Sequence, residues 1–173
     1  MYKVGGLFLL TMKDVINIYH KKAAEFISAF KTKQLSNLDI KLENVHLKRL
    51  NSISSYNIFS HSDLYVASST LYELMQPQGK KGSHNYHELT PDDIIEGLRS
   101  LQKPKAIVET QSKRIIIITV CFSHFELPLM FVIERNTELT ANVHKKVNKL
   151  ITAYPKDEID KYIDKSFKKL YIK

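Results

Sequence analysis

Cysteine, glycine and proline are all scarce in this chain of 173 residues. A single cysteine, Cys121, rules out an internal disulfide framework and a cysteine-rich zinc site, and it agrees with a reducing, cytoplasmic compartment. Five glycines and five prolines exclude collagen-like and low-complexity classes. The longest apolar runs, residues 115–122 and 127–133, are far shorter than the roughly 20 residues that span a bilayer, so we expect no membrane partner.

The motifs that hold nucleotides or metals are also missing. The sequence has no GxGxxG or Walker loop, no HExxH pair and no calcium-binding loop. His84 and His87 are three positions apart, but no cysteine or acid lies at zinc-finger spacing from them. Cys121 lies among isoleucines and valines, which is more typical of an inert buried thiol than of a nucleophile. We therefore expect neither a cofactor nor a metal.

Charge is biased to one sign. The 26 lysines and arginines outnumber 18 acidic residues, which gives a formal net charge of +8 and a pI near 9.4. This bias favours phosphate-rich partners such as RNA, although a lysine-rich solvated surface would look the same. Only four of the basic residues are arginines, so the charge suits loose attraction to phosphates better than bidentate recognition of bases.

The first 75 residues contain both helical and strand patterns. The spacing of apolar residues predicts an amphipathic helix over residues 11–30, and alternation predicts a strand over residues 38–42. Ser62 or Asp63 could cap a further helix that reaches Met75. Residues 76–83 contain two glycines, one proline and two lysines, and so form the best boundary in the chain. We predict an N-terminal α/β extension at 1–75, either separate or part of the same core, and a second domain at 84–173.

The second domain has clearer signals. The motif Thr-Pro-Asp-Asp at 90–93 predicts a helix start, with a threonine cap and two acids on the positive end of the helix dipole. Apolar patterns then predict strands at 106–108, 114–122 and 126–134. They predict a segment that is helical at first and then strand at 146–154, and a closing helix at 157–171.

This order of elements indicates a fold class. Consecutive strands with short links form antiparallel sheets, and the flanking helices then pack against the sheet. We predict an α+β fold with an antiparallel sheet of about four strands and helices packed on one side, plus the N-terminal helical and strand extension.

Polar residues that could carry chemistry flank these elements: His87, Lys113, Arg114, Thr152, Tyr154 and Lys156. Such a set suits cleavage of RNA without a metal, in which a base takes the proton of the ribose 2′-hydroxyl, cations hold the charge on phosphorus and an acid protonates the leaving oxygen. Histidine is the natural acid or base near neutral pH. The ordinary alternative is a histidine that precedes a helix, common strand residues and solvated charges.

Several short motifs point to a family. Residues 87–90, 101–104, 106–108 and 150–155 resemble the toxin-like C-terminal domain of phage MuF-type proteins, and the related nucleases of the barnase, EndoU, colicin and RelE-like superfamily. The resemblance covers residues 84–156 and implies a helix, a four-stranded antiparallel sheet and a ribonuclease-type site on the sheet. It assigns His87 to the motif histidine and Thr152 and Tyr154 to the terminal motif. A basic strand residue would correspond to Lys113 or Arg114.

Together these observations favour a metal-independent endoribonuclease of toxin or phage type that cleaves RNA by attack of the 2′-hydroxyl. The predicted catalytic residues are His87, Arg114, Thr152 and Tyr154, and the predicted substrate-binding residues are Lys113 and Lys156. A free ribonuclease would harm its own cell, so we expect an antitoxin or immunity partner, or delivery into a target cell. The alternative is a non-catalytic RNA-binding or protein-interaction module of a mobile element with a nuclease-like fold.

Overall fold

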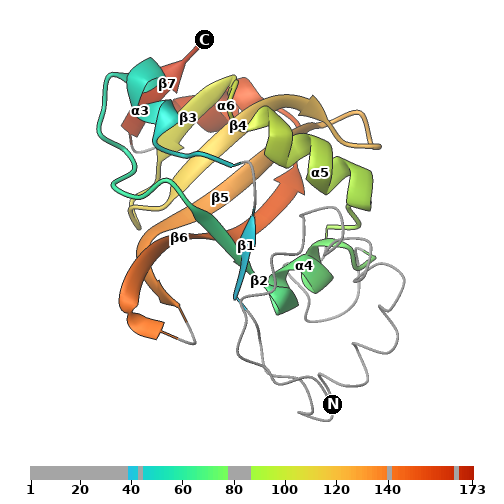
Figure 1. The fold of residues 1–173 in the computed structure, drawn as a ribbon. Coiled ribbons are helices and arrows are strands. Elements are labelled where there is room, and N and C mark those ends of the chain that lie inside the picture. The colour runs from blue at the N-terminus through green and yellow to red at the C-terminus, as the bar shows by residue number, and fades with distance from the viewer. Residues whose placement is uncertain (1–38, 43–44, 78–86, 140–141, 166–167) are drawn as a thin grey trace, which may run out of the picture.

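The computed structural model describes residues 39–42, 45–77, 87–139, 142–165 and 168–173 (Figure 1). Their strands and helices, in chain order, are β1 (Asp39–Leu42), α3 (Arg49–Ser54), β2 (Leu64–Ala67), α4 (Ser68–Leu74), α5 (Pro91–Ser100), β3 (Ala106–Glu109), β4 (Ile115–Phe122), β5 (Pro128–Leu139), β6 (Asn142–Pro155), α6 (Ile159–Asp164) and β7 (Lys168–Ile172). The predicted helix at 11–30 lies outside the described residues.

The prediction of a four-stranded antiparallel sheet was wrong. The described strands form one mixed sheet of seven, in the order β1-β2-β6-β5-β4-β3-β7. The consecutive strands β3 to β6 are antiparallel, but β2 pairs in parallel with β6 and β7 joins the outer edge of β3. Of the added strands, β1 matches the strand predicted at 38–42. β2 and β7 have only 4 and 5 residues and pair with strands distant in the chain, so no local pattern predicts them.

Helices cover both faces of the sheet, rather than one face as we predicted. Side chains of β4 alternate between two apolar clusters, with Ile117 in one and Ile118 in the other. The first, here the α5-side cluster, contains Ile94 and Leu98 of α5. The second, the α6-side cluster, contains Ile159 and Ile163 of α6. Figure 1 shows α5 lying across its face of the sheet.

Helix α5 begins where the sequence predicts. Thr90 is the N-cap, its Oγ1 accepts from the backbone N of Asp93 at 3.1 Å, and the Asp93 carboxylate accepts from the backbone N of Thr90 at 2.8 Å. This reciprocal capping box satisfies two backbone donors at the helix start. Gly97 then lets the helix approach the sheet closely, because a Cβ there would lie 2.5 Å from Cζ of Phe131.

Three predicted helical stretches are wholly or partly strands. The apolar residues of the segment 62–75 belong first to β2, where Leu64, Tyr65 and Val66 are all buried, and only then to α4. A run buried on both faces lacks the alternation that marks a strand. The segment 146–154 is strand throughout. Its first part has no strand pattern in the sequence because bulges, where β6 pairs with β5, break the two-residue period. The predicted helix at 157–171 divides into α6 and β7, since pairing with β3 offers the C-terminal segment a backbone partner.

Long-range contacts hold the described part of the N-terminal segment onto the sheet. The side-chain amide of Asn148 donates to the carbonyls of His61 and Asp63 at 2.9 and 3.1 Å. Arg135 of β5 donates to the carbonyl of Ile58 at 3.1 Å and pairs with Glu109. β1 and β2 are therefore strands of the common sheet, while the predicted division at 1–75 and 84–173 stays a prediction.

Candidate functional site

Three of the sequence-predicted site residues meet at the C-terminal end of β6. Nε2 of His87 lies 3.1 Å from Oγ1 of Thr152, and the rings of His87 and Tyr154 have centroids 5.4 Å apart. The pairs between β2 and β6 end at Val66 and Leu150, so β6 continues beyond its neighbour here. We call His87, Thr152 and Tyr154 the His87 cluster.

The strand period places the two β6 side chains on one face. Thr152 and Tyr154 are two positions apart, with the buried Ala153 between them in the α5-side cluster. Tyr154 packs against the α6-side cluster, which also includes Tyr162. The helix and the strand thus fix the phenol, while His87 reaches the same place from the segment that leads into α5.

Burial sets the protonation states of this cluster. Partial burial lowers the pKa of His87, because an imidazolium loses hydration there, so the ring is neutral and can accept a proton near neutral pH. Burial, and after it the neighbouring Tyr162 hydroxyl, raises the pKa of Tyr154 far above its usual range. The cluster therefore combines a neutral base with a phenol that stays a hydrogen-bond donor.

The two predicted basic residues of the β3–β4 turn contact other groups. Arg114 pairs with Glu134 at 3.9 Å, and the carbonyl of Lys113 accepts from Arg135 at 3.2 Å. Lys113 has a positive φ of 61°, which the tight turn requires. Both residues lie where β4 begins, whereas Thr152 lies near the end of β6, two strands away in the sheet order.

Lys156 lies closer to the cluster. It follows the last residue of β6, and its backbone N donates to the carbonyl of Pro128 at 2.9 Å. Its ammonium is partly exposed and lies 3.9 Å from the carboxylate of Asp157. Of the two predicted substrate-binding lysines, Lys156 therefore lies at the same end of β6 as His87.

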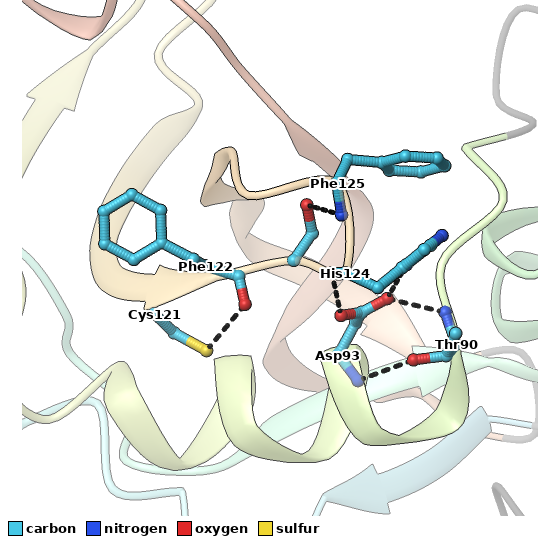
Figure 2. Close-up of polar contacts among 7 residues, drawn as sticks. Thr90, Asp93, Cys121, Phe122, His124 and Phe125 are labelled. Atoms are coloured by element: carbon cyan, nitrogen blue, oxygen red, sulfur yellow. Dashed lines mark hydrogen bonds and ion pairs between the residues drawn. The ribbon is translucent and has the colours of Figure 1, made fainter.

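A second polar group, missed by sequence reasoning, lies at the start of α5 (Figure 2). The carboxylate of Asp93 accepts from the backbone N of His124 at 2.8 Å through Oδ1, and Oδ2 lies 2.6 Å from Nδ1 of His124. The sequence marks Asp93 only as an acid at the start of a helix, and it gives His124 no role. Nothing in the spacing of 31 residues between them predicts the pair.

Hydrogen bonds determine the charge state of Asp93. Burial of this carboxyl by itself raises its pKa, but the bonds from Thr90 and His124 together hold the pKa below its usual value. The pKa of the nearby Cys121 thiol is shifted the other way, because burial and the negative charges of Glu96 and Asp93 raise it. In Figure 2 the thiol and the His124 ring lie on different sides of Asp93. A protonated thiol in this setting is a poor nucleophile.

Two further findings concern only the described part of the chain. No group of three or more His, Cys, Asp or Glu side chains gathers there in a way that could hold a metal ion. None of the helices described is long and apolar enough to cross a membrane.

Comparison with known proteins places both polar groups inside one recognised domain. The family model described as the phage MuF C-terminal domain matches residues 78–173, which is more than half of the chain. The matched region contains the His87 cluster, the Asp93–His124 pair and Lys156. No curated protein and no solved structure matches the chain.

Proposed function

The chain belongs to the phage MuF C-terminal domain family, and from this premise we propose that it is a metal-independent endoribonuclease of toxin type. The observation that carries the proposal is the meeting of His87 with Thr152 and Tyr154, across 65 positions of sequence between His87 and Thr152. A neutral imidazole beside a hydroxyl and a phenol is a set of groups that RNA cleavage can use directly. The assignment to the wider nuclease superfamily is part of this proposal.

The proposed reaction uses these groups in order. Nε2 of His87 accepts the proton of the ribose 2′-hydroxyl, and the 2′-oxygen attacks phosphorus. The bond from phosphorus to the 5′-oxygen breaks, which leaves a 2′,3′-cyclic phosphate and, once that oxygen is protonated, a 5′-hydroxyl end. Thr152 and Tyr154 donate hydrogen bonds to the phosphoryl oxygens as their negative charge grows. No metal takes part in these steps.

Charge supports an RNA substrate. The net charge of +8 attracts a polyanion, and Lys156 lies two positions after Tyr154. Arg114 contacts Glu134, so the geometry does not favour a direct catalytic role for it. We assign Arg114 and Lys113 to phosphates further along the RNA.

The proposed activity implies a controlling partner. A cytoplasmic ribonuclease would degrade the RNA of its own cell, so an antitoxin or immunity protein would have to cover the site until the protein is released or delivered. A non-catalytic RNA-binding module is the second candidate function. It is favoured by one observation, the pairing of Arg114 with Glu134, which leaves that guanidinium away from the His87 cluster.

The test is cleavage of a synthetic RNA by the purified full chain in the presence of EDTA. We expect products with 2′,3′-cyclic phosphate and 5′-hydroxyl ends, identified by mass spectrometry. A single 2′-deoxy substitution at the cleaved position should block the reaction, because it removes the nucleophile. Binding without cleavage of any RNA would instead favour the non-catalytic module.

A further inference from the structure

The Asp93–His124 pair has a geometry that a helix cap alone does not require. Both carboxylate oxygens of Asp93 engage His124, one through its backbone N at 2.8 Å and the other through Nδ1 at 2.6 Å. The Asp93 side chain is only 6% exposed, while that of His124 is 38% exposed. The buried carboxylate of Asp93 thus fixes the position of the partly exposed His124 imidazole.

This arrangement fixes which ring nitrogen of His124 faces outward. A carboxylate oxygen can only accept, so Nδ1 carries the proton that it donates to Asp93. Nε2 is then the ring nitrogen that faces away from the carboxylate and is available to a substrate. Figure 2 shows this outer nitrogen pointing away from Cys121 and from the carboxylate. The neighbouring Phe125 ring, with its centroid 3.8 Å from that of the imidazole, packs against the ring as well.

A short stretch of chain links the pair to the His87 cluster. The Oδ2 atom that contacts His124 also accepts from the backbone N of Thr90, and His87 precedes Thr90 by only three residues. Three residues span at most about 11 Å even when fully extended. Here they are not fully extended, since Glu88 between them has a positive φ of 53°.

The strand ends of the sheet also relate the His87 cluster to the Asp93–His124 pair. Tyr154 pairs with Met130 of β5, and Lys156 donates to the carbonyl of Pro128, the first residue of β5. The turn that carries His124 directly precedes Pro128 and is closed by a bond from the backbone N of Ser123 to the carbonyl of Leu127 at 2.8 Å. The turn after β4 carries His124 and the end of β6 contacts His87, so both histidines lie toward the same edge of the sheet.

We propose that His124 is the general acid of this site, with Asp93 as the residue that positions it. The inference rests on the proposed ribonuclease function. As His87 takes the proton of the 2′-hydroxyl, the protonated Nε2 of His124 gives its proton to the departing 5′-oxygen. Each turnover leaves His87 protonated and His124 neutral, and water restores both when it opens the cyclic phosphate or by simple exchange. Because the proposed reaction assigns Thr152 and Tyr154 to the phosphoryl oxygens, this assignment gives the leaving oxygen a proton donor of its own.

The test compares two substrates in EDTA: a uridine-containing dinucleotide, and uridine 3′-phosphate esterified with 4-nitrophenol. The first leaving group is an alkoxide that needs a proton, whereas 4-nitrophenolate leaves as a stable anion. We expect His124→Ala to lose roughly 10²–10⁴-fold in kcat/KM on the dinucleotide. On the aryl ester the same variant should retain a rate close to that of the wild type.

Matched variants keep the outcome decisive. His87→Ala should lose activity on both substrates, because the 2′-hydroxyl needs a base in each case. Asp93→Asn should affect the dinucleotide more than the aryl ester, and this ratio of rates is insensitive to any loss of folded protein. His46→Ala, which changes an exposed histidine before α3, should change neither rate.

Two outcomes would overturn the assignment while leaving the proposed function in place. One is an undiminished rate of His124→Ala on the dinucleotide. The other is an equal loss on both substrates, which would make His124 a structural residue only. If the wild type cleaves neither substrate nor any longer RNA, the proposed function fails and the inference fails with it.

Discussion

Nε2 of His87 and Oγ1 of Thr152 lie 3.1 Å apart although 65 positions separate the two residues in the chain. The contact exists because β6 continues past its last pair with β2, at Leu150, and the segment before α5 passes beside the extension. The functional proposal depends on this arrangement, which joins a neutral imidazole to the end of a strand that also carries Tyr154.

Gly97→Ala should destabilise the protein, although alanine is the better helix former. Helix propensity favours the change by about 1 kcal/mol. A Cβ at this position would lie 2.5 Å from Cζ and 2.9 Å from Cε2 of Phe131, so the helix and the sheet must move apart. Overpacking of this kind costs about 1–3 kcal/mol. Urea unfolding should therefore give a lower free energy of unfolding for the variant.

A paired substitution separates the clash from other effects of Gly97→Ala. Phe131→Leu removes the ring atoms that the new Cβ would meet, so the double variant should lose less than the sum of the two single losses. Strict additivity would mean that the close packing of α5 on β5 is not the cause.

Thr90→Ala should lower the free energy of unfolding by about 1 kcal/mol, the usual loss when a capping hydroxyl is removed. The change leaves the backbone N of Asp93 without its acceptor at the start of α5. Thr90→Ser keeps the hydroxyl and serves as the control, with a stability close to that of the wild type. Equal stability of the alanine and serine variants in urea would contradict the capping role.

Stability should fall on mild acidification in a way that depends on His87. The pKa of His87 in the folded protein is lowered by burial relative to about 6.5 in the unfolded chain, so the unfolded state binds the proton first. The stability from the neutral ring is complete above about pH 6.5 and is lost as the pH falls toward the folded pKa. Urea midpoints at pH 7.5 and pH 5.5 should therefore differ less for His87→Gln than for the wild type.

The chain has six other histidines, so only the difference between wild type and variant is informative. His46→Gln provides the control, since this exposed side chain should leave the pH dependence unchanged. An identical pH response in the wild type and in His87→Gln would show that the ring is not buried as described.

Sequence patterns identified the elements with strong local signals and missed those that depend on distant partners. The capping box at Thr90 and the isoleucine-rich strand β4 were recognisable because caps and apolar runs are local. β7 was read as helix because its apolar residues fit a helical face, and only its pairing with β3 makes it a strand. The first half of β6 was likewise predicted as helix, because its bulges break the alternation of apolar and polar residues by which a strand is predicted.

The site shows the same division. His87, Thr152 and Tyr154 could be predicted as candidates from their chemistry and their positions at the ends of elements, and these three residues do lie together. Arg114 lies elsewhere because it directly precedes β4, two strands away from β6 in the sheet order. His124 could not be predicted from the sequence, because its partner Asp93 is already explained there as an acid on the positive end of the helix dipole.

The two predicted substrate-binding lysines should differ in their effect on short RNA. Lys156 lies beside the His87 cluster, whereas Lys113 lies at the start of β4. Binding of a trinucleotide with 2′-deoxy sugars should weaken in Lys156→Ala, and the slope of log K against log salt should shrink by about 0.7, the value for one lost phosphate contact on a single strand. Lys113→Ala should leave both quantities unchanged for the trinucleotide and affect only longer strands. Equal effects of the two substitutions on the trinucleotide would contradict this placement.

The central claim is that the His87 cluster cleaves RNA. Its most direct test is the single-turnover rate of RNA cleavage in EDTA for the double variant His87→Ala with Tyr154→Phe, beside the wild type and His46→Ala. We expect the double variant to lose at least roughly 10²–10⁴-fold, the contribution of one general base, while His46→Ala keeps the wild-type rate. A double variant that cleaves RNA as fast as the wild type would show that the reaction, if present, takes place elsewhere.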